Sequence, residues 1–347
     1  MKKIHTLLFA SLAMLAAAIT TASCEKINSS TSDEIQQKIL DAWIRVNHPG
    51  LTASDNGIYT LSSTEGTGRQ LEDSLYVFVK YSARTLDGTY TDYNYEDLAK
   101  QMGAFSYSTY YTYDIWYISE STLTDGLNEV LKKMKVGGKV EAAIPPAMLE
   151  SNTTSYYSLY YYTTDSDSKT NVIYDIEVLG AVDDIYQYQI DCLEEYRDKN
   201  FPGLDSLSYG FYLKKTKAVD YTDNPEDTLT DDTSVNVWYV GRTLDGFVFD
   251  TNIEDTAKKY RFYSSSGTYT AKSVTWNTDY STIASDNSLI DGFSKGLSLM
   301  ERGEKATVFF YSGLGYGESG SSSTSSSLPG YLPLEFELYI APKSTSN

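Results

Sequence analysis

Alternating apolar and polar positions predict β-strands over much of this chain, and the clearest strands form a hairpin. The first strand carries apolar or small residues at every second position, namely Val235, Val237, Tyr239 and Gly241. This parity is typical of a strand with one buried face. The turn Leu244-Asp245-Gly246 follows, and Asp-Gly tolerates the positive φ of a tight hairpin. Extended structure resumes at residues 247–249.

Apolar residues at helical spacing predict two longer helices. The first places Ile35, Ile39, Trp43 and Val46 on one face, behind a capping box formed by Thr31 and Glu34. The second follows Asp183-Asp184 and spaces Tyr186, Ile190, Leu193 and Tyr196 in the same way. Both helices should end at an Asn-x-Pro-Gly sequence, because proline disfavours helix at the residue before it.

Two short helices are predicted between the strands. Their apolar faces are Leu127, Val130, Leu131 and Met134 in one, and Phe293, Leu297 and Met300 in the other. Gly137 and Gly303 follow them, and we expect these glycines to end the helices.

The sequence repeats internally. Asn-His-Pro-Gly-Leu at 47–51 returns as Asn-Phe-Pro-Gly-Leu at 200–204, and the segment 79–88 returns at 237–246 with the same Arg-Thr-Leu-Asp-Gly ending. Self-similarity of this kind predicts two copies of one structural unit. We call residues 33–182 repeat 1 and residues 183–342 repeat 2.

The order of motifs in repeat 2 resembles that of the FKBP-type peptidyl-prolyl cis-trans isomerases. A tyrosine in a strand, an Asp-Gly turn, Phe-Asp, an Ile-x-Gly-aromatic sequence that opens a short helix, and Tyr-Gly are followed by a closing apolar strand. The resemblance covers most of residues 232–342. It implies an α+β fold of two tandem FKBP-like domains, each a curved antiparallel sheet wrapped around a short helix and each preceded by an N-terminal helix.

The resemblance also implies a pocket in repeat 2. Its residues would be Tyr239, Phe249, Asp250, Ile290, Phe293, Tyr316 and Phe336. Tyr316 matches the tyrosine whose hydroxyl donates to the substrate carbonyl, and Ile290 matches the residue whose backbone amide contacts substrate. The departures are Phe293 where most members have tryptophan, Leu328-Pro329-Gly330 where Ile-Pro-Pro is usual, and a long insertion between Asp250 and Leu289.

Repeat 1 keeps fewer of these residues. Tyr81 and Asp92 match the family, whereas five other pocket positions hold Thr91, Thr124, Leu127, Glu150 and Tyr174. We expect a retained fold with a lost site. An acid such as Glu150 would be costly in an apolar pocket if it were buried.

Composition excludes several classes of function. The net charge of −19 argues against nucleic-acid binding, which requires a basic surface. Of the two histidines, only His48 lies beyond the first 23 residues. A catalytic histidine relay or a histidine-rich metal site in the mature chain would therefore have at most one histidine. Isomerisation of a prolyl bond requires no cofactor or metal, in agreement with this composition.

The N-terminal residues predict export and anchoring. Lys2 and Lys3 precede an apolar run from Leu7 to Ile19, which is short for a membrane span, and small residues then precede Cys24. Residues 1–23 are expected to be a signal peptide, Cys24 the lipid attachment site and residues 24–32 the lipidated tether. The protein would then be anchored in the bacterial cell envelope, at the outer membrane. An ordinary cleavable signal peptide is the alternative.

Three segments have biased composition. Ser106–Ile118 and 156–164 are rich in tyrosine, and 319–327 is a serine run; the last two fall where the family has its flap over the active site. The tyrosines suit edge strands, and a glycan-binding or peptide-binding surface is the alternative. The serine run is expected to be a loop.

Three functions fit the sequence. The first is a lipid-anchored prolyl isomerase with the activity in repeat 2, acting on proline-containing polypeptides and open to macrolide-type inhibitors of the family. The second is a non-catalytic polypeptide-binding protein or chaperone of the same fold. The third is a glycan-binding surface lipoprotein.

Overall fold

The computed structural model describes residues 32–150, 170–220, 228–322 and 327–343. Within these residues, the elements of repeat 1 are α2 (Ser32–Asn47), β1 (Tyr59–Thr64), β2 (Tyr76–Thr85), β3 (Tyr90–Tyr93), α3 (Glu96–Gln101), β4 (Asp114–Tyr117), α4 (Asp125–Lys132), β5 (Lys139–Ile144), η1 (Pro146–Met148) and β6 (Val172–Val182). Cys24 and residues 156–164 lie outside the described residues.

Repeat 2 has the same succession of strands with additional helices. Its elements are α5 (Ile185–Asn200), β7 (Phe211–Lys217), β8 (Thr233–Thr243), β9 (Val248–Thr251), α6 (Glu254–Lys259), β10 (Lys272–Trp276), α7 (Tyr280–Asn287), α8 (Asp291–Ser298), β11 (Lys305–Phe310), η3 (Ser312–Leu314), η4 (Gly317–Ser319), β12 (Ser321–Ser322), β13 (Ser327–Leu328) and β14 (Leu334–Ile340). The strands and turn of the hairpin predicted from residue 235 onward are confirmed as β8 and β9, and Gly246 has a φ of +95°.

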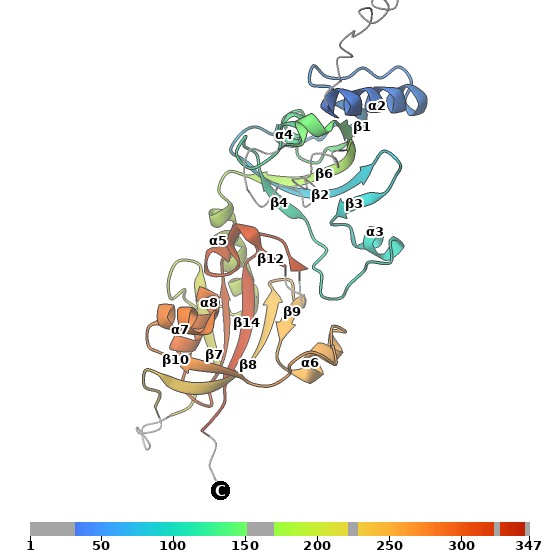
Figure 1. The fold of residues 1–347 in the computed structure, drawn as a ribbon. Coiled ribbons are helices and arrows are strands. Elements are labelled where there is room, and N and C mark those ends of the chain that lie inside the picture. The colour runs from blue at the N-terminus through green and yellow to red at the C-terminus, as the bar shows by residue number, and fades with distance from the viewer. Residues whose placement is uncertain (1–31, 151–169, 221–227, 323–326, 344–347) are drawn as a thin grey trace, which may run out of the picture.

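Twelve of the described strands form two six-stranded antiparallel sheets with equivalent connectivity (Figure 1), and β12 and β13 pair with each other. One sheet has the order β1-β5-β6-β2, and β3 and β4 both pair with β2. The other has the order β7-β11-β14-β8, and β9 and β10 both pair with β8. The α+β class with antiparallel sheets is therefore confirmed, and each strand of one sheet has a counterpart at the same place in the other.

Each sheet buries one face against its short helix. Leu127 and Leu131 of α4 belong to the core of the first sheet, and Phe293 and Leu297 of α8 belong to the core of the second. The Trp276 indole donates a 2.9 Å hydrogen bond to the carbonyl of Leu297, which ties α8 to β10.

The predicted roles of two glycines were wrong. Helices α4 and α8 end at Lys132 and Ser298, several residues before Gly137 and Gly303. Each glycine has a positive φ in the turn that leads into the next strand, and Gly303 N–H donates to the carbonyl of Ile340. The glycines shape the entry to β5 and β11 instead of capping the helices.

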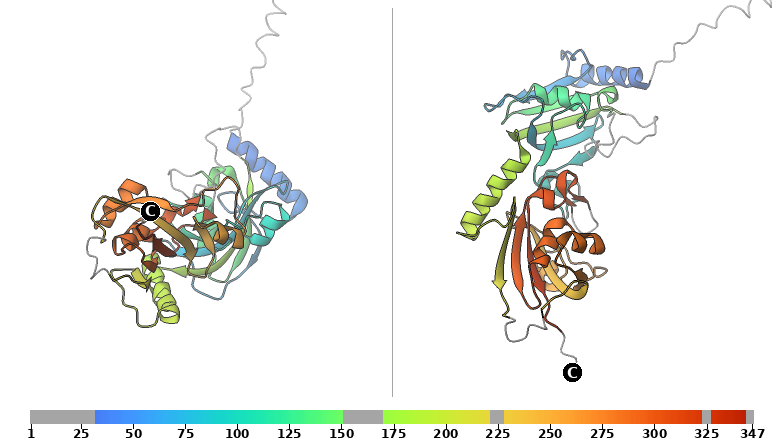
Figure 2. Two further views of the ribbon diagram at one scale, coloured as in Figure 1. Left: turned by 90° about the horizontal axis from the view of Figure 1, so that it is seen from below. Right: turned by 90° about the vertical axis from the view of Figure 1, so that its left-hand side faces the viewer.

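The long helices pack on the opposite faces of the sheets, as Figure 2 shows for α5. Both end at the predicted Asn residues. The buried face predicted for α2 was wrong, because Leu40 and Ile44 face the first sheet, where they contact a cluster that includes Ile173. Ile35, Ile39 and Val46 are 48%, 45% and 79% exposed. Helix α5 buries Leu193 in a cluster that contains Tyr212 and Phe309.

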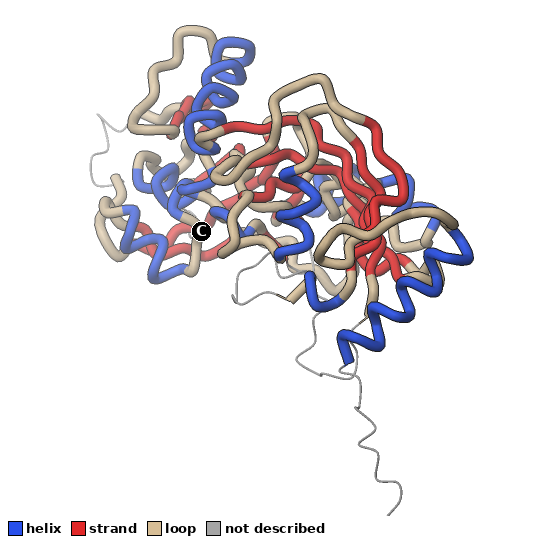
Figure 3. The backbone as a smooth tube through the Cα atoms, turned by 90° about the horizontal axis from the view of Figure 1, so that it is seen from above, coloured by secondary structure: helices blue, strands red, loops and turns tan. Residues whose placement is uncertain are grey.

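The tyrosine-rich segment 106–118 is mostly not a strand. Only Asp114–Tyr117 forms β4. The preceding residues form the loop that runs from α3 towards the second sheet (Figure 1). Figure 3 draws the strands of the chain in red and its loops and turns in tan. The ends of the serine run pair as β12 and β13. Among the described residues, no helix has the length and apolar character needed to cross a membrane.

Candidate active site

The polar part of the candidate site is a pair of residues on adjacent strands. Tyr239 of β8 donates its hydroxyl hydrogen to Asp250 Oδ2 of β9 at 3.0 Å. Asn252 fixes this arrangement, since its Oδ1 accepts from Tyr239 N–H at 2.9 Å and its amide donates to the carbonyl of Val237 at 2.8 Å. The short hairpin thus holds the two side chains in one register.

Three phenylalanine rings form the buried part of the site. The Phe336 ring lies 5.6 Å from that of Phe249 and 5.2 Å from that of Phe293, and both pairs are nearly perpendicular. Tyr239 meets Phe293 edge-on at 5.4 Å. Each of the three phenylalanines is at most 3% exposed. Edge-to-face pairs of this kind add about 0.5–1.5 kcal/mol each beyond area burial.

Ile290 and Tyr316 lie against the same cluster and are only partly buried. Ile290 is the residue before α8, with extended backbone angles, and the Tyr316 ring centroid is 6.3 Å from that of Phe249. All seven residues predicted from the sequence therefore lie in or beside one aromatic cluster, with Asp250 joined to it through Tyr239.

Burial alters the acidity of the polar groups. It raises the pKa of Tyr316 to about 12, with a further contribution from the charge of Asp250. The pKa of Asp250 is raised by burial, while the hydrogen bonds from Tyr239 and the Thr251 backbone lower it. Tyr316 consequently keeps its proton at neutral pH and can act there as a hydrogen-bond donor.

Gly241 is a residue of the site that sequence reasoning missed as such. It pairs with Phe336 on one side and with Asp250 on the other. A Cβ at this position would lie 2.8 Å from ring atoms of both Phe249 and Phe336, which is closer than carbon atoms pack. Its counterpart in repeat 1 is Ala83. The rings of Phe249 and Phe336 leave no space for the Cβ that an alanine would add at position 241.

Leu328 and strand β10 belong to the same region. Leu328, which departs from the usual family sequence, is 4% exposed and belongs to the same core as Phe249. The prediction of an insertion between Asp250 and Leu289 was wrong in part, because β10 within this segment has β4 as its counterpart in repeat 1. The segment is therefore partly an element common to both repeats, to which repeat 2 adds α7.

The corresponding place in repeat 1 is a cavity of about 580 Å³ that both polar and apolar side chains line. Tyr81 donates to Asp92 Oδ2 at 2.7 Å, reproducing the pair in repeat 2. Thr91 and Leu127 line the cavity where repeat 2 has phenylalanines. Residues of repeat 2 also line it, namely Glu318, Ser319, Ser322, Ser327, Leu328, Pro329 and Gly330. The prediction that Glu150 disturbs this site was wrong, because Glu150 is exposed and the acids that line the cavity are Asp92 and Asp114 of repeat 1 and Glu318 of repeat 2.

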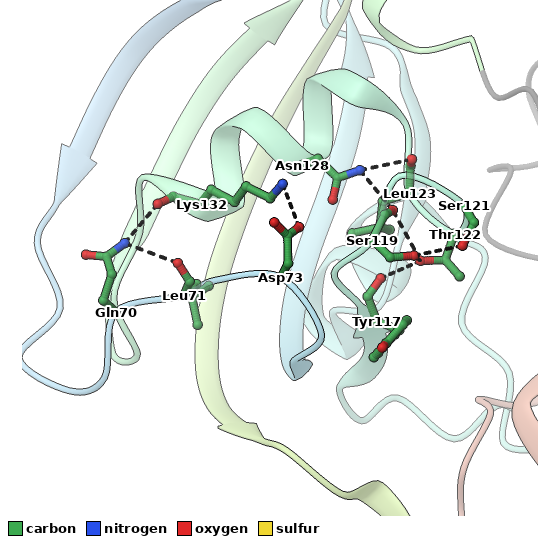
Figure 4. Close-up of polar contacts among 10 residues, drawn as sticks. All are labelled: Gln70, Leu71, Asp73, Tyr117, Ser119, Ser121, Thr122, Leu123, Asn128 and Lys132. Atoms are coloured by element: carbon green, nitrogen blue, oxygen red, sulfur yellow. Dashed lines mark hydrogen bonds and ion pairs between the residues drawn. The ribbon is translucent and has the colours of Figure 1, made fainter.

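Polar contacts fix α4 beside this cavity (Figure 4). Asn128 donates to the carbonyls of Ser119 and Leu123 at 3.0 and 3.1 Å. Lys132 pairs with Asp73 at 2.6 Å near the other end of the helix. The cavity is thus part of an ordered scaffold.

Two carboxyl groups, those of Asp92 and Asp114, lie at the cavity of repeat 1 and interact electrostatically. Burial and the nearby charge of Asp92 raise the pKa of Asp114 to about 7. Strand pairing places Asp114 opposite Val79, at the position that Lys272 occupies opposite Val237 in repeat 2. Lys272 lowers the pKa of Asp250 through its charge, so the two repeats have opposite electrostatics at one equivalent position.

Comparison with family models finds a match in repeat 2. Residues 226–340 match the sequence model described as FKBP-type peptidyl-prolyl cis-trans isomerase. The matched residues include strands β8, β9 and β14 and helix α8, which carry the candidate site. No curated protein matches the chain.

Solved structures similar to the chain include three isomerases or FKBP proteins. The three FKBP domains of wheat FKBP73 are 16% identical, with 83% of this chain and 95% of that chain covered and a TM-score of 0.29. FkpA from Escherichia coli is 20% identical, with 50% and 71% covered and a TM-score of 0.31. A peptidyl-prolyl cis-trans isomerase from Pseudomonas syringae pv. tomato is 20% identical, with 46% and 96% covered and a TM-score of 0.30.

The raised pKa of Asp114 predicts a pH-dependent stability. Between about pH 4 and pH 7 the folded protein retains a proton that the unfolded chain releases, so the free energy of unfolding falls as the pH rises. Asp114→Asn removes this dependence. Relative to the wild type, the variant should gain stability from pH 5 to pH 8, by at most about 3 kcal/mol, because only about two pH units separate pH 5 from the raised pKa of about 7.

Urea unfolding at the two pH values measures this gain. Asp97→Asn, at an exposed residue of α3, is the control and should follow the wild type at both pH values. A constant difference between Asp114→Asn and wild type at pH 5 and pH 8 would contradict the assignment.

Proposed function

We propose that this protein is a peptidyl-prolyl cis-trans isomerase whose activity resides in repeat 2. The observation that carries the proposal is the cluster of Tyr239, Phe249, Phe293 and Phe336 with Asp250, within residues that match the family model. Proline-containing polypeptides would be its substrates, and macrolide-type inhibitors of the family are candidate ligands.

The proposed mechanism uses desolvation and one hydrogen bond. Rotation about an X-Pro bond is slow because amide resonance gives a barrier of about 18–20 kcal/mol. A twisted amide has less charge separation than a planar one, so an apolar site such as that of Phe249 and Phe336 penalises it less than the ground state. Tyr316 would donate to the substrate carbonyl. Among the described residues, no group of histidine, cysteine or acidic side chains could hold a metal ion.

We further propose that repeat 1 is a diverged copy of the same domain. Equivalent strand connectivity and the Tyr81–Asp92 hydrogen bond support common ancestry of the two repeats. Its cavity lacks two of the rings of the repeat 2 cluster, because Thr91 and Leu127 stand in place of Phe249 and Phe293, and it holds the carboxyl groups of Asp92 and Asp114. Repeat 1 is therefore assigned no isomerase activity.

We also propose that the protein is exported and lipid-anchored at Cys24 in the bacterial cell envelope. The sequence of residues 1–23 and the polar tether to residue 32 support this location. An envelope protein with a tether would present both repeats away from the membrane surface.

Matched substitutions in the two repeats test the location of the activity. Phe249→Leu removes an aromatic wall and should lower kcat/KM for a short X-Pro peptide at least about tenfold in a protease-coupled assay, or about 1.4 kcal/mol of transition-state stabilisation. Its counterpart Thr91→Val should leave kcat/KM within about twofold of the wild type. Circular dichroism and thermal unfolding of the full chain verify that both variants fold.

Equal losses in the two variants would contradict the assignment to repeat 2. A wild-type protein that binds unfolded polypeptide but shows no isomerisation would favour the non-catalytic chaperone. Glycan binding without either property would favour the third function.

The hydroxyl of Tyr316 should make a smaller contribution than the rings. Tyr316→Phe removes one hydrogen bond, worth about 1 kcal/mol, and should reduce kcat/KM by no more than about tenfold. Tyr311→Phe, in the neighbouring turn, is the control and should leave the rate unchanged. A complete loss of activity in Tyr316→Phe with an intact fold would mean that the hydroxyl has a chemical role beyond hydrogen bonding.

Anchoring at Cys24 is tested separately in a bacterial host. Cys24→Ser should abolish incorporation of labelled lipid and move the protein from the membrane to the soluble fraction, or leave the precursor unprocessed. Cys192→Ser is the control and should retain the lipid. Unchanged membrane partition in Cys24→Ser would refute the anchor.

A further inference from the structure

A loop of repeat 1 lies against the candidate site of repeat 2. The segment between α3 and β4 extends from the first sheet to the second, near β9 and β12 (Figure 1). Thr109 forms a parallel bridge with Ser327 of β13. Tyr110 N–H donates to the carbonyl of Ser327 at 3.0 Å, and Ser327 N–H donates to the carbonyl of Ser108 at 3.0 Å.

The side chain of Tyr110 reaches the β8–β9 turn. Its ring centroid is 4.9 Å from that of Phe247, and its hydroxyl donates to Asp245 Oδ2 at 2.6 Å. Tyr110 also packs against the core cluster that contains Phe249 and Leu328. One residue of repeat 1 therefore contacts two segments of repeat 2 that carry the site.

A second tyrosine of the same loop reinforces this docking. Tyr107 accepts a hydrogen bond from Arg261 at 2.9 Å, and the Arg261 guanidinium lies 5.4 Å from the Tyr107 ring centroid. Arg261 follows α6, beyond the β9 strand that carries Phe249 and Asp250. The contact is exposed, so we assign it a smaller contribution than that of Tyr110.

We propose that Tyr110 is a positioning residue for the isomerase site, supplied by repeat 1. It joins the turn that precedes Phe249 and Asp250 to the strand that carries Leu328, and so holds both sides of the aromatic cluster in one arrangement. The inference rests on the isomerase function proposed for repeat 2. It gives the diverged repeat 1 a part in the site of its neighbour.

The expected effect is on substrate binding. Without Tyr110 the two segments can separate, and the apparent affinity falls in proportion to the fraction of molecules with an assembled site. Once substrate has assembled the site, the rate of rotation changes little. We therefore expect Tyr110→Ala to raise KM for a short X-Pro peptide about five- to tenfold and to leave kcat within about twofold.

Conservative and control variants of the full chain distinguish positioning from general destabilisation. Tyr110→Phe keeps the contact with Phe247 and should bring KM to within about threefold of the wild type. Tyr111→Phe loses a hydroxyl whose hydrogen bonds, to Ser106 and Ala104, stay within the loop, and it should leave KM unchanged. A fall in kcat at constant KM, or the same KM effect in Tyr111→Phe, would overturn the proposal.

Amide hydrogen exchange tests the same proposal without reference to activity. In Tyr110→Ala, the Ser327 amide should exchange at least about tenfold faster, whereas that of Val308 in the central strand β11 should not change. Unchanged exchange at Ser327 would overturn the inference. Faster exchange at Ser327 in a protein without isomerase activity would support the docking and refute the proposed function alone.

Discussion

The absence of a side chain at Gly241 is the constraint on which the aromatic site depends. Strand β8 passes between β14 and β9 at this residue, so the rings of Phe336 and Phe249 converge over it from the two sides. A methyl group would occupy the space in which the rings meet. Close packing leaves no room to absorb such a change, because a core responds to even one added carbon.

The same constraint accounts for several differences between the repeats together. Repeat 1 has Ala83 at this position, Thr91 in place of Phe249 and Tyr174 in place of Phe336. With the methyl group of Ala83 present, the smaller side chain of Thr91 in place of a phenylalanine leaves space for that methyl group. The space then accommodates polar groups, and Asp114 in place of Lys272 converts it into an acidic cavity. The two repeats thus differ at this place by a correlated change of packing and charge.

Some features of the fold could be predicted from short segments because their causes are local. The β8–β9 hairpin follows from an Asp-Gly turn between alternating residues, and the ends of α2 and α5 follow from proline two residues further on. The buried face of α2 could not be predicted in this way. Its apolar residues surround the helix, and the sheet surface around Ile173 selects Leu40 and Ile44 over Ile35 and Ile39.

The candidate site also combines residues that short sequence motifs predict with residues whose roles depend on distant parts of the chain. Its seven residues could be placed by a family resemblance, since each belongs to a short motif. The role of Gly241 depends on two rings that arrive from different strands. The role of Tyr110 depends on Asp245, 135 residues away in the sequence, and in the sequence it is one tyrosine among 32. Neither residue carries a local signal that distinguishes it.

Each repeat contributes a tyrosine to a hydrophobic cluster that contains residues of the other repeat, so the two repeats are joined at two points. Tyr110 packs against the core cluster of repeat 2, and Tyr331 of repeat 2 packs against Phe78 and Ile115 of repeat 1, in a cluster that also contains Ile185 of α5. Tyr331 has a left-handed φ of 59°, which costs about 1 kcal/mol or more and is tolerated because the ring is buried. Ser327 and Tyr331 lie on either side of Leu328, and both contact repeat 1. The two contacts together fix the direction of the residues 327–331 as well as their position.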